Sequence, residues 1–94
     1  MDFSRRLNRN NWMDRIDKII EILKTVSNKP ALPGREESLF DSGYLDSFAL
    51  PEVVGELEKE FHIRIPDSDL NPRKFETIDR MDRYVALAVS AAKS

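Results

Sequence analysis

The 94-residue sequence predicts an all-α fold, a helical bundle of three main helices plus one short helix, with a long loop between the first two helices. Two observations lead to this prediction. Three segments repeat apolar residues at spacings of three and four, and the one short stretch that alternates like a strand has no partner strand. A chain of this length supports a single core. We therefore expect one domain over residues 11–94, preceded by a flexible basic tail over residues 1–10.

The composition excludes most catalytic and metal-binding classes. The chain has no cysteine and one histidine, so it lacks the residues for disulfides, thiolate metal sites and the usual Ser/His relay. No apolar stretch approaches the length of a membrane span and no secretory leader is recognisable, so we expect a cytoplasmic protein without membrane insertion. Residues 35–69 carry 10 acidic and 3 basic side chains. Charge of this sign disfavours nucleic acid and favours basic protein partners, although a solvated acidic face explains it equally well.

The first helix is expected over residues 11–27, with Asn11 as its N-cap and Asp14 in its first turn. Its apolar face consists of Trp12, Ile16, Ile19, Ile20, Leu23 and Val26. The sequence Asn28 to Gly34, with two prolines, ends this helix and begins a connection that reaches Asp46. Loops of this length are usually functional.

The second helix follows the loop, and Pro51 falls in its first turn, where a missing N–H costs little. Its apolar face consists of Leu50, Val53, Val54, Leu57 and Phe61. Residues 63–66 are expected to form an extended loop with two apolar anchors. Asn71 and Pro72 predict a short helix over 72–75, and Thr77 is expected to cap the last helix. The buried stripe of that helix is predicted to be Ile78, Met81, Val85, Ala88 and Ala92.

The segment over residues 39–48 carries the chemistry. Phe40 and Leu45 are expected to anchor it to the core, and Gly43 permits a turn with positive φ. Ser47 then lies at a helix N-terminus, where unpaired N–H groups and the helix dipole stabilise a phosphate ester on its hydroxyl. The alternative is that Asp46 or Ser47 is only an N-cap.

The string LFDSGYLDS (39–47), the later EKEFHIRIPDSDL (58–70) and FETI (75–78) resemble the acyl carrier protein family, including its D-alanyl carrier type, over about residues 12–90. The resemblance implies that Ser47 receives 4′-phosphopantetheine from coenzyme A, and that Asp46 helps to orient the metal of the attaching enzyme. It further implies that an acyl or aminoacyl group is held on this arm as a thioester. The chain has no base to activate Ser47, so a phosphopantetheinyl transferase must supply the base and the Mg²⁺. The protein would then be a carrier domain and not an enzyme, and acyl- or aminoacyl-loading and transfer enzymes would be its further partners.

The sequence departs from the family pattern at Phe48, Pro51 and Gly55. These departures favour a dedicated pathway over general fatty-acid synthesis. At helical spacing, one surface stripe beside Ser47 comprises Phe48, Glu52, Gly55, Glu56 and Lys59, and partner enzymes are expected to bind this stripe.

Other functions and sites remain open at the level of sequence. An unmodified helical adaptor that binds a protein through the acidic second helix is the alternative function. Asp67 and Asp69 are better explained as capping carboxylates than as metal ligands, so we expect no metal site. The chain is expected to be a monomer.

Overall fold

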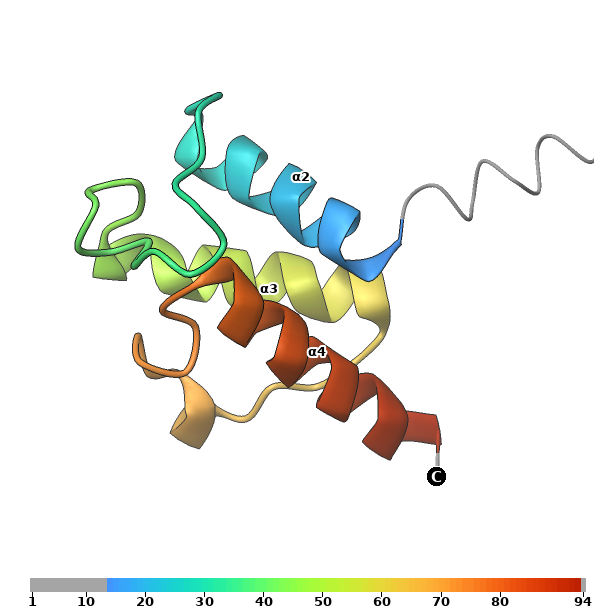
Figure 1. Cartoon of the computed structure of the whole chain (residues 1–94). Coiled ribbons are helices and arrows are strands. Elements are labelled where there is room, and N and C mark those ends of the chain that lie inside the picture. Colours follow the sequence, from blue (N-terminus) through green and yellow to red (C-terminus); the bar gives the residue numbers. More distant parts are fainter. Residues whose placement is uncertain (1–13, 94) are drawn as a thin grey trace, which may run out of the picture.

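The computed structural model describes residues 14–93, which form an all-helical domain (Figure 1). Three α-helices, α2 (Arg15–Ser27), α3 (Leu50–Phe61) and α4 (Ile78–Lys93), alternate with two 3₁₀ turns, η1 (Ser47–Ala49) and η2 (Asp67–Asp69). This part of the chain contains no β-strand. The predicted fold class and the long connection between the first two helices, residues 28–46, are confirmed. The tail 1–10, Asn11 and Trp12 lie outside the described residues.

The N-terminus of α2 differs from the prediction. The sequence predicts Asp14 in the first turn, but its backbone is extended and its side chain accepts a hydrogen bond from the Asp17 N–H at 3.2 Å. Asp14 is therefore the N-cap of α2. Its carboxylate lies just before the helix and accepts a hydrogen bond from a backbone N–H of the first turn, which has no partner within the helix. At the other end, Asn28 takes the left-handed conformation (φ 60°), and its N–H donates to the Lys24 carbonyl at 2.9 Å. Asparagine tolerates this conformation better than most residues.

The α3 helix follows the predicted pattern. Pro51 lies in its first turn, as expected, and His62 ends it in the left-handed conformation (φ 56°). The chain beyond is extended, with the side chains of Ile63 and Ile65 buried and that of Arg64 exposed. The expected loop with two apolar anchors is confirmed.

The short helix predicted over residues 72–75 is wrong. This segment forms hydrogen-bonded turns, in which Lys74 N–H donates to the Asn71 carbonyl at 2.9 Å and Phe75 N–H to the Pro72 carbonyl at 3.2 Å. The side chain of Asn71 accepts from the Arg73 N–H at 2.8 Å and so supports a turn. The turn ends at Phe75, whose side chain is completely buried in the core.

The α4 helix begins where expected, because the Thr77 hydroxyl accepts a hydrogen bond from the Arg80 N–H at 3.0 Å. The predicted stripe is correct at Ile78, Met81 and Val85, which are buried. Its last member, Ala92, is exposed. The helical period continues to Ala92, but the core ends about one turn earlier, where Ala88 and Val89 pack against it.

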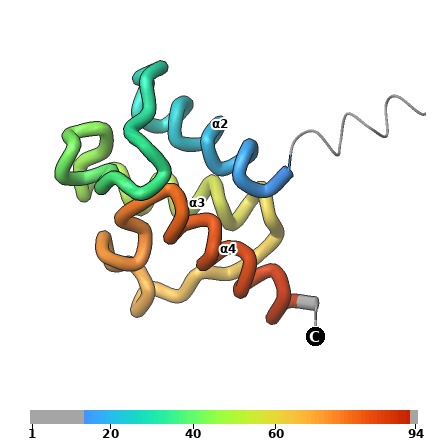
Figure 2. The backbone as a smooth tube through the Cα atoms, in the orientation of Figure 1, coloured from blue at the N-terminus to red at the C-terminus, as the bar shows by residue number. Residues whose placement is uncertain are grey.

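The core lies between the three helices, and α2 contacts both α3 and α4. The long loop also contributes to it, through the completely buried Leu39. Figure 2 shows this loop running from the end of α2 toward the start of α4 and returning to the start of α3. Two backbone bonds fix that path: Asp79 N–H donates to the Arg35 carbonyl at 3.1 Å, and Leu39 N–H to the Glu76 carbonyl at 2.7 Å. The loop therefore reaches α3 from a fixed direction.

Candidate functional site

Ser47 is the first residue of η1, the 3₁₀ turn that leads directly into α3. The expectation that it lies at the start of the second helix is correct to within one turn, since α3 itself begins at Leu50. The residue is exposed, and within residues 14–93 no hydrogen bond involves its hydroxyl. The hydroxyl is therefore open to a partner molecule.

Asp46 is the N-cap of this turn. Its backbone is extended, and its Oδ1 atom accepts a hydrogen bond from the Ala49 N–H at 3.0 Å. The capping role that the sequence assigned to either Asp46 or Ser47 thus belongs to Asp46. The second carboxylate oxygen of Asp46, Oδ2, has no hydrogen-bond partner among the described residues. One oxygen holds the turn and the other remains free beside Ser47.

The loop before Ser47 turns at Gly43, which has a φ of 82°. A side chain is strained in this conformation, so the predicted need for glycine is confirmed. Leu45 is buried and Phe40 is half-buried against the core, as expected of the two anchors. Leu45 N–H also donates to the Leu39 carbonyl at 2.9 Å, which closes the loop on itself.

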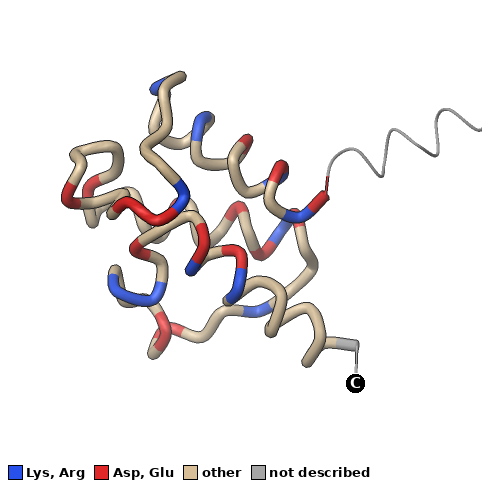
Figure 3. Tube along the Cα trace, viewed as in Figure 1, with Lys and Arg blue, Asp and Glu red and all other residues tan. Residues whose placement is uncertain are grey.

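The surface beside Ser47 combines one apolar side chain with several carboxylates. Phe48 is 91% exposed, and Glu52 is also exposed. Glu56 is half-buried and forms an ion pair with Lys59 at 3.5 Å. Figure 3 shows that acidic residues also line the loop that precedes α3. Phe48 is thus a large apolar side chain that is exposed to water directly after Ser47 in the sequence.

Gly55 is half-buried and lines a groove of about 820 Å³ between α3 and residues 63–67. Its lining also includes the buried Ile63 and Ile65 and the exposed Lys59 and Asp67. A β-carbon at Gly55 would meet no atom within 4 Å. The sequence identified Gly55 but not the groove, which depends on how the extended segment 63–66 returns along α3.

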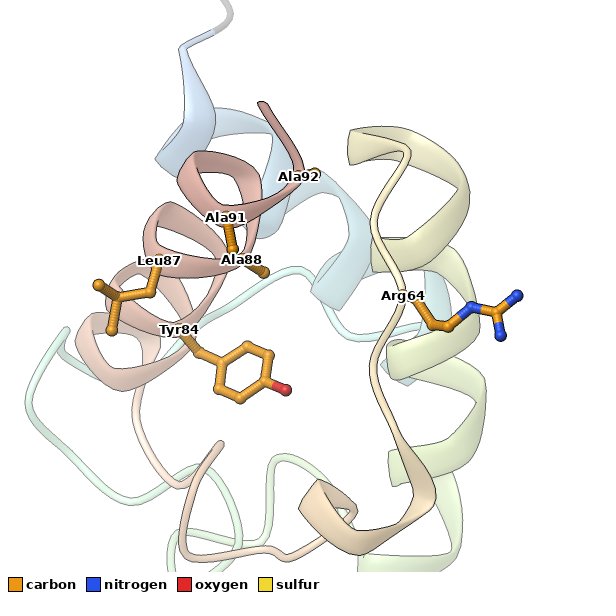
Figure 4. Close-up of a pocket in the computed structure, with 6 residues that line it drawn as sticks. All are labelled: Arg64, Tyr84, Leu87, Ala88, Ala91 and Ala92. Carbon is orange, nitrogen blue, oxygen red and sulfur yellow. The ribbon is translucent and has the colours of Figure 1, made fainter. Parts of the chain in front are cut away.

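A second groove, of about 470 Å³, follows α4 (Figure 4). Its lining consists of Arg64, Tyr84, Leu87, Ala88, Ala91 and Ala92. The Arg64 guanidinium points away from the alanines, so the groove is mainly apolar. Leu87, at 68% exposure, and Phe48 are the large apolar side chains that remain exposed within residues 14–93. None of the site residues predicted from the sequence contributes to this groove.

The carboxylate of Asp69 is occupied by two neighbours. The Tyr84 hydroxyl donates to Asp69 Oδ2 at 2.6 Å, and the Lys74 ammonium lies 3.2 Å from Asp69 Oδ1. The bonds from Tyr84 and Lys74 lower the pKa of Asp69, while burial and the bond to Asp69 raise the pKa of Tyr84 to about 12. Asp69 therefore joins η2 to α4.

Comparison with known proteins identifies the family. A family model described as a phosphopantetheine attachment site matches residues 17–85. The D-alanyl carrier protein of Leuconostoc mesenteroides subsp. mesenteroides is 32% identical over 69 residues, which cover 73% of this chain and 88% of the relative. The D-alanyl carrier protein of Streptococcus sanguinis is 33% identical, with 73% of this chain and 87% of the relative covered. No solved structure shows a significant match.

The part of the chain that matches the family model contains the fold and the candidate site described above. The matched region runs from α2 into α4 and includes the loop, η1 and α3. Within residues 14–93, no helix is long and apolar enough to cross a membrane. Members of this family are carriers that bear a phosphopantetheine arm and are served by modifying and loading enzymes, and they are not catalysts themselves. The chain belongs to the phosphopantetheine-binding family of carrier proteins and is distantly related to D-alanyl carrier proteins.

Proposed function

We propose that Ser47 is the residue that receives 4′-phosphopantetheine. The observation that carries this proposal is an exposed hydroxyl that has no hydrogen-bond partner within residues 14–93, at the first residue of a turn that Asp46 caps. Because Ser47 is exposed, its hydroxyl can carry a long flexible substituent that extends into solvent. When bound, the arm supplies a thiol that holds the cargo as a thioester, in a chain that has no cysteine of its own.

Asp46 supports the attachment in two ways. Its Oδ1 atom holds the turn through the Ala49 N–H, and its free Oδ2 atom is available to a Mg²⁺ ion that the transferase brings. The single histidine of the sequence, His62, lies at the far end of α3 from Ser47 and so is not placed to act as its base. The transferase must therefore remove the hydroxyl proton as well.

The proposed partner surface consists of Phe48, Glu52, Gly55 and Glu56. The exposed Phe48 ring provides an apolar anchor next to Ser47, and the two carboxylates attract enzymes with a basic docking surface. Gly55 leaves space for a partner side chain between α3 and residues 63–67. The partners are a phosphopantetheinyl transferase and the enzymes that load and transfer the cargo.

The proposed cargo is a small aminoacyl group. The support for this choice is the similarity to D-alanyl carrier proteins, which covers 73% of the chain. An acyl group is the other cargo that the family admits. A cytoplasmic, monomeric protein without nucleic-acid partners remains our prediction, which cell fractionation and sedimentation can check.

The direct test is mass spectrometry after incubation with coenzyme A, Mg²⁺ and a transferase of broad specificity. We expect the mass of one phosphopantetheine group on the wild type and none on Ser47→Ala. The chain offers a matched control, because Asp67 and Ser68 repeat the Asp–Ser dipeptide in η2, where Ser68 is also exposed. Ser68→Ala should be modified like the wild type. A wild type that stays unmodified with several transferases would favour the unmodified adaptor instead.

A further inference from the structure

Two hydrogen bonds join the end of α2 to the segment that leads into Ser47. The Lys29 ammonium donates to the Gly43 carbonyl at 2.8 Å, and the Tyr44 hydroxyl donates to the Lys29 carbonyl at 3.1 Å. We call this reciprocal pair of bonds the Lys29–Tyr44 clasp. The two partners are 14 positions apart in the first bond and 15 positions apart in the second, so the clasp joins the long loop near its two ends.

The clasp fixes two backbone turns relative to each other. On one side is Asn28, which ends α2 in the left-handed conformation, and on the other is Gly43, whose φ is also positive. The ring of Tyr44 is buried, at 6% exposure, which holds its hydroxyl in place. Ser47 follows three residues after Tyr44. The clasp therefore adds two bonds to the backbone bonds that set the direction from which the chain enters η1.

Burial does not explain the bond from Lys29 to Gly43. Lys29 and Gly43 are both exposed, so water could form hydrogen bonds with the Lys29 ammonium and with the Gly43 carbonyl instead. The two bonds instead order an irregular segment that is not held by the hydrogen bonds of a helix. Fixing such a segment in advance removes an entropic cost that a docking enzyme would otherwise have to meet.

We propose that Lys29 and Tyr44 are positioning residues for Ser47, which keep residues 43–47 in one conformation for the enzyme that attaches the arm. This inference rests on the proposed attachment at Ser47. Neither residue touches the reacting hydroxyl in the structure, and both act through the loop backbone.

The kinetic test compares variants that cut the clasp with variants that make the same chemical change elsewhere. Tyr44→Phe removes one hydroxyl bond of the clasp, whereas Tyr84→Phe removes a hydroxyl bond between α4 and η2. Lys29→Met removes the other clasp bond, and Lys24→Met removes a cation one turn earlier, at the end of α2. We expect each clasp variant to raise the KM of the transferase for the carrier about three- to tenfold at unchanged kcat, as the loss of one hydrogen bond implies.

The two control variants should keep the KM of the wild type. Lys29→Arg should have a KM close to that of the wild type, because a guanidinium also donates a hydrogen bond to a carbonyl. Equal KM values for Tyr44→Phe and the wild type would overturn the inference. Equal losses in Tyr44→Phe and Tyr84→Phe would also overturn it, since they would show a general effect of stability.

A second measurement on the unmodified protein does not depend on the transferase. The Leu45 and Ala49 amides both donate hydrogen bonds next to Ser47, and their hydrogen exchange should be at least threefold faster in the clasp variants and unchanged in the controls. Unchanged exchange would show that the clasp does not order this segment and would overturn the inference. A wild type that fails to be modified at Ser47, with exchange responding as expected, would reject the proposed attachment and not the ordering of the loop.

Discussion

Asp46 and Ala49 are joined by a hydrogen bond of 3.0 Å from the Ala49 N–H to Asp46 Oδ1, and this bond holds the turn that begins with Ser47. The same carboxylate keeps Oδ2 free. A cap needs a hydrogen-bond acceptor, whereas a metal ion needs the negative charge. Substitutions that remove one property at a time therefore separate the two roles.

Asp46→Asn keeps the acceptor and removes the charge. We expect the free energy of unfolding to stay within about 0.5 kcal/mol of the wild type, because asparagine caps as well as aspartate does. Modification of Ser47 should nevertheless slow by at least tenfold if Oδ2 binds the Mg²⁺ of the transferase. Asp46→Ala should lose both properties and destabilise the protein by about 1 kcal/mol. Urea denaturation and transferase kinetics measure the two effects, and full activity of Asp46→Asn would reject the role in metal binding.

The double reversal Glu52→Lys/Glu56→Lys should slow association with a basic transferase or loading enzyme. Both carboxylates lie on the proposed partner surface, and opposite charges raise the rate of encounter. The stability should change little, because the ion pair of Glu56 with Lys59 is at the surface. The defect should shrink at high salt, where screening weakens the advantage of the wild type.

The control for this charge reversal is Glu21→Lys/Glu36→Lys. It produces the same change in net charge at two exposed residues on α2 and the long loop. Stopped-flow measurement of the association rate at low salt should show wild-type behaviour for the control. Equal rates for both double variants would mean that net charge alone, and not the surface of α3, steers the partner.

Gly55→Ala should stabilise the protein by about 0.5–1 kcal/mol. Alanine favours the helix and restricts the unfolded chain, and the added β-carbon meets no atom within 4 Å. Gly55→Met should keep this gain but place a long side chain in the groove between α3 and residues 63–67. We expect it to lower the rate of cargo transfer while Gly55→Ala alters that rate much less. Full transfer activity of Gly55→Met would show that the groove receives no part of a partner.

Features set by a few neighbouring residues could be predicted from the sequence. Gly43 has the positive φ that its turn requires, Pro51 occupies the first turn of α3, and Thr77 caps α4. The N-cap of α2 was assigned incorrectly, because Asn11 and Asp14 are both good capping residues and the apolar period does not choose between them. The stripe of α4 was extended to Ala92, since periodicity does not show where the opposing helices end.

The remaining features depend on segments that approach each other only in the folded chain. Nothing local to Lys29 indicates that its ammonium reaches Gly43, and nothing local to Tyr84 indicates a bond to Asp69. The groove beside Gly55 likewise arises from the return of residues 63–67 along α3. Sequence patterns therefore predicted the long loop and the helix that follows Ser47, but not the contacts that hold the loop.

The burial of Tyr84 and its bond with Asp69 should make stability depend on pH at both extremes. Folding raises the pKa of Tyr84 from 10.0 to about 12, so the stabilisation is complete below pH 10 and is lost as the pH rises through this interval. Folding lowers the pKa of Asp69 below 3.8, so its contribution is present above that pH and is lost under more acidic conditions.

Urea denaturation at pH 8, 10 and 11.5 should show that the difference in the free energy of unfolding between wild type and Tyr84→Phe shrinks toward the highest pH. A difference that stays constant from pH 8 to 11.5 would mean that folding does not raise the pKa of Tyr84.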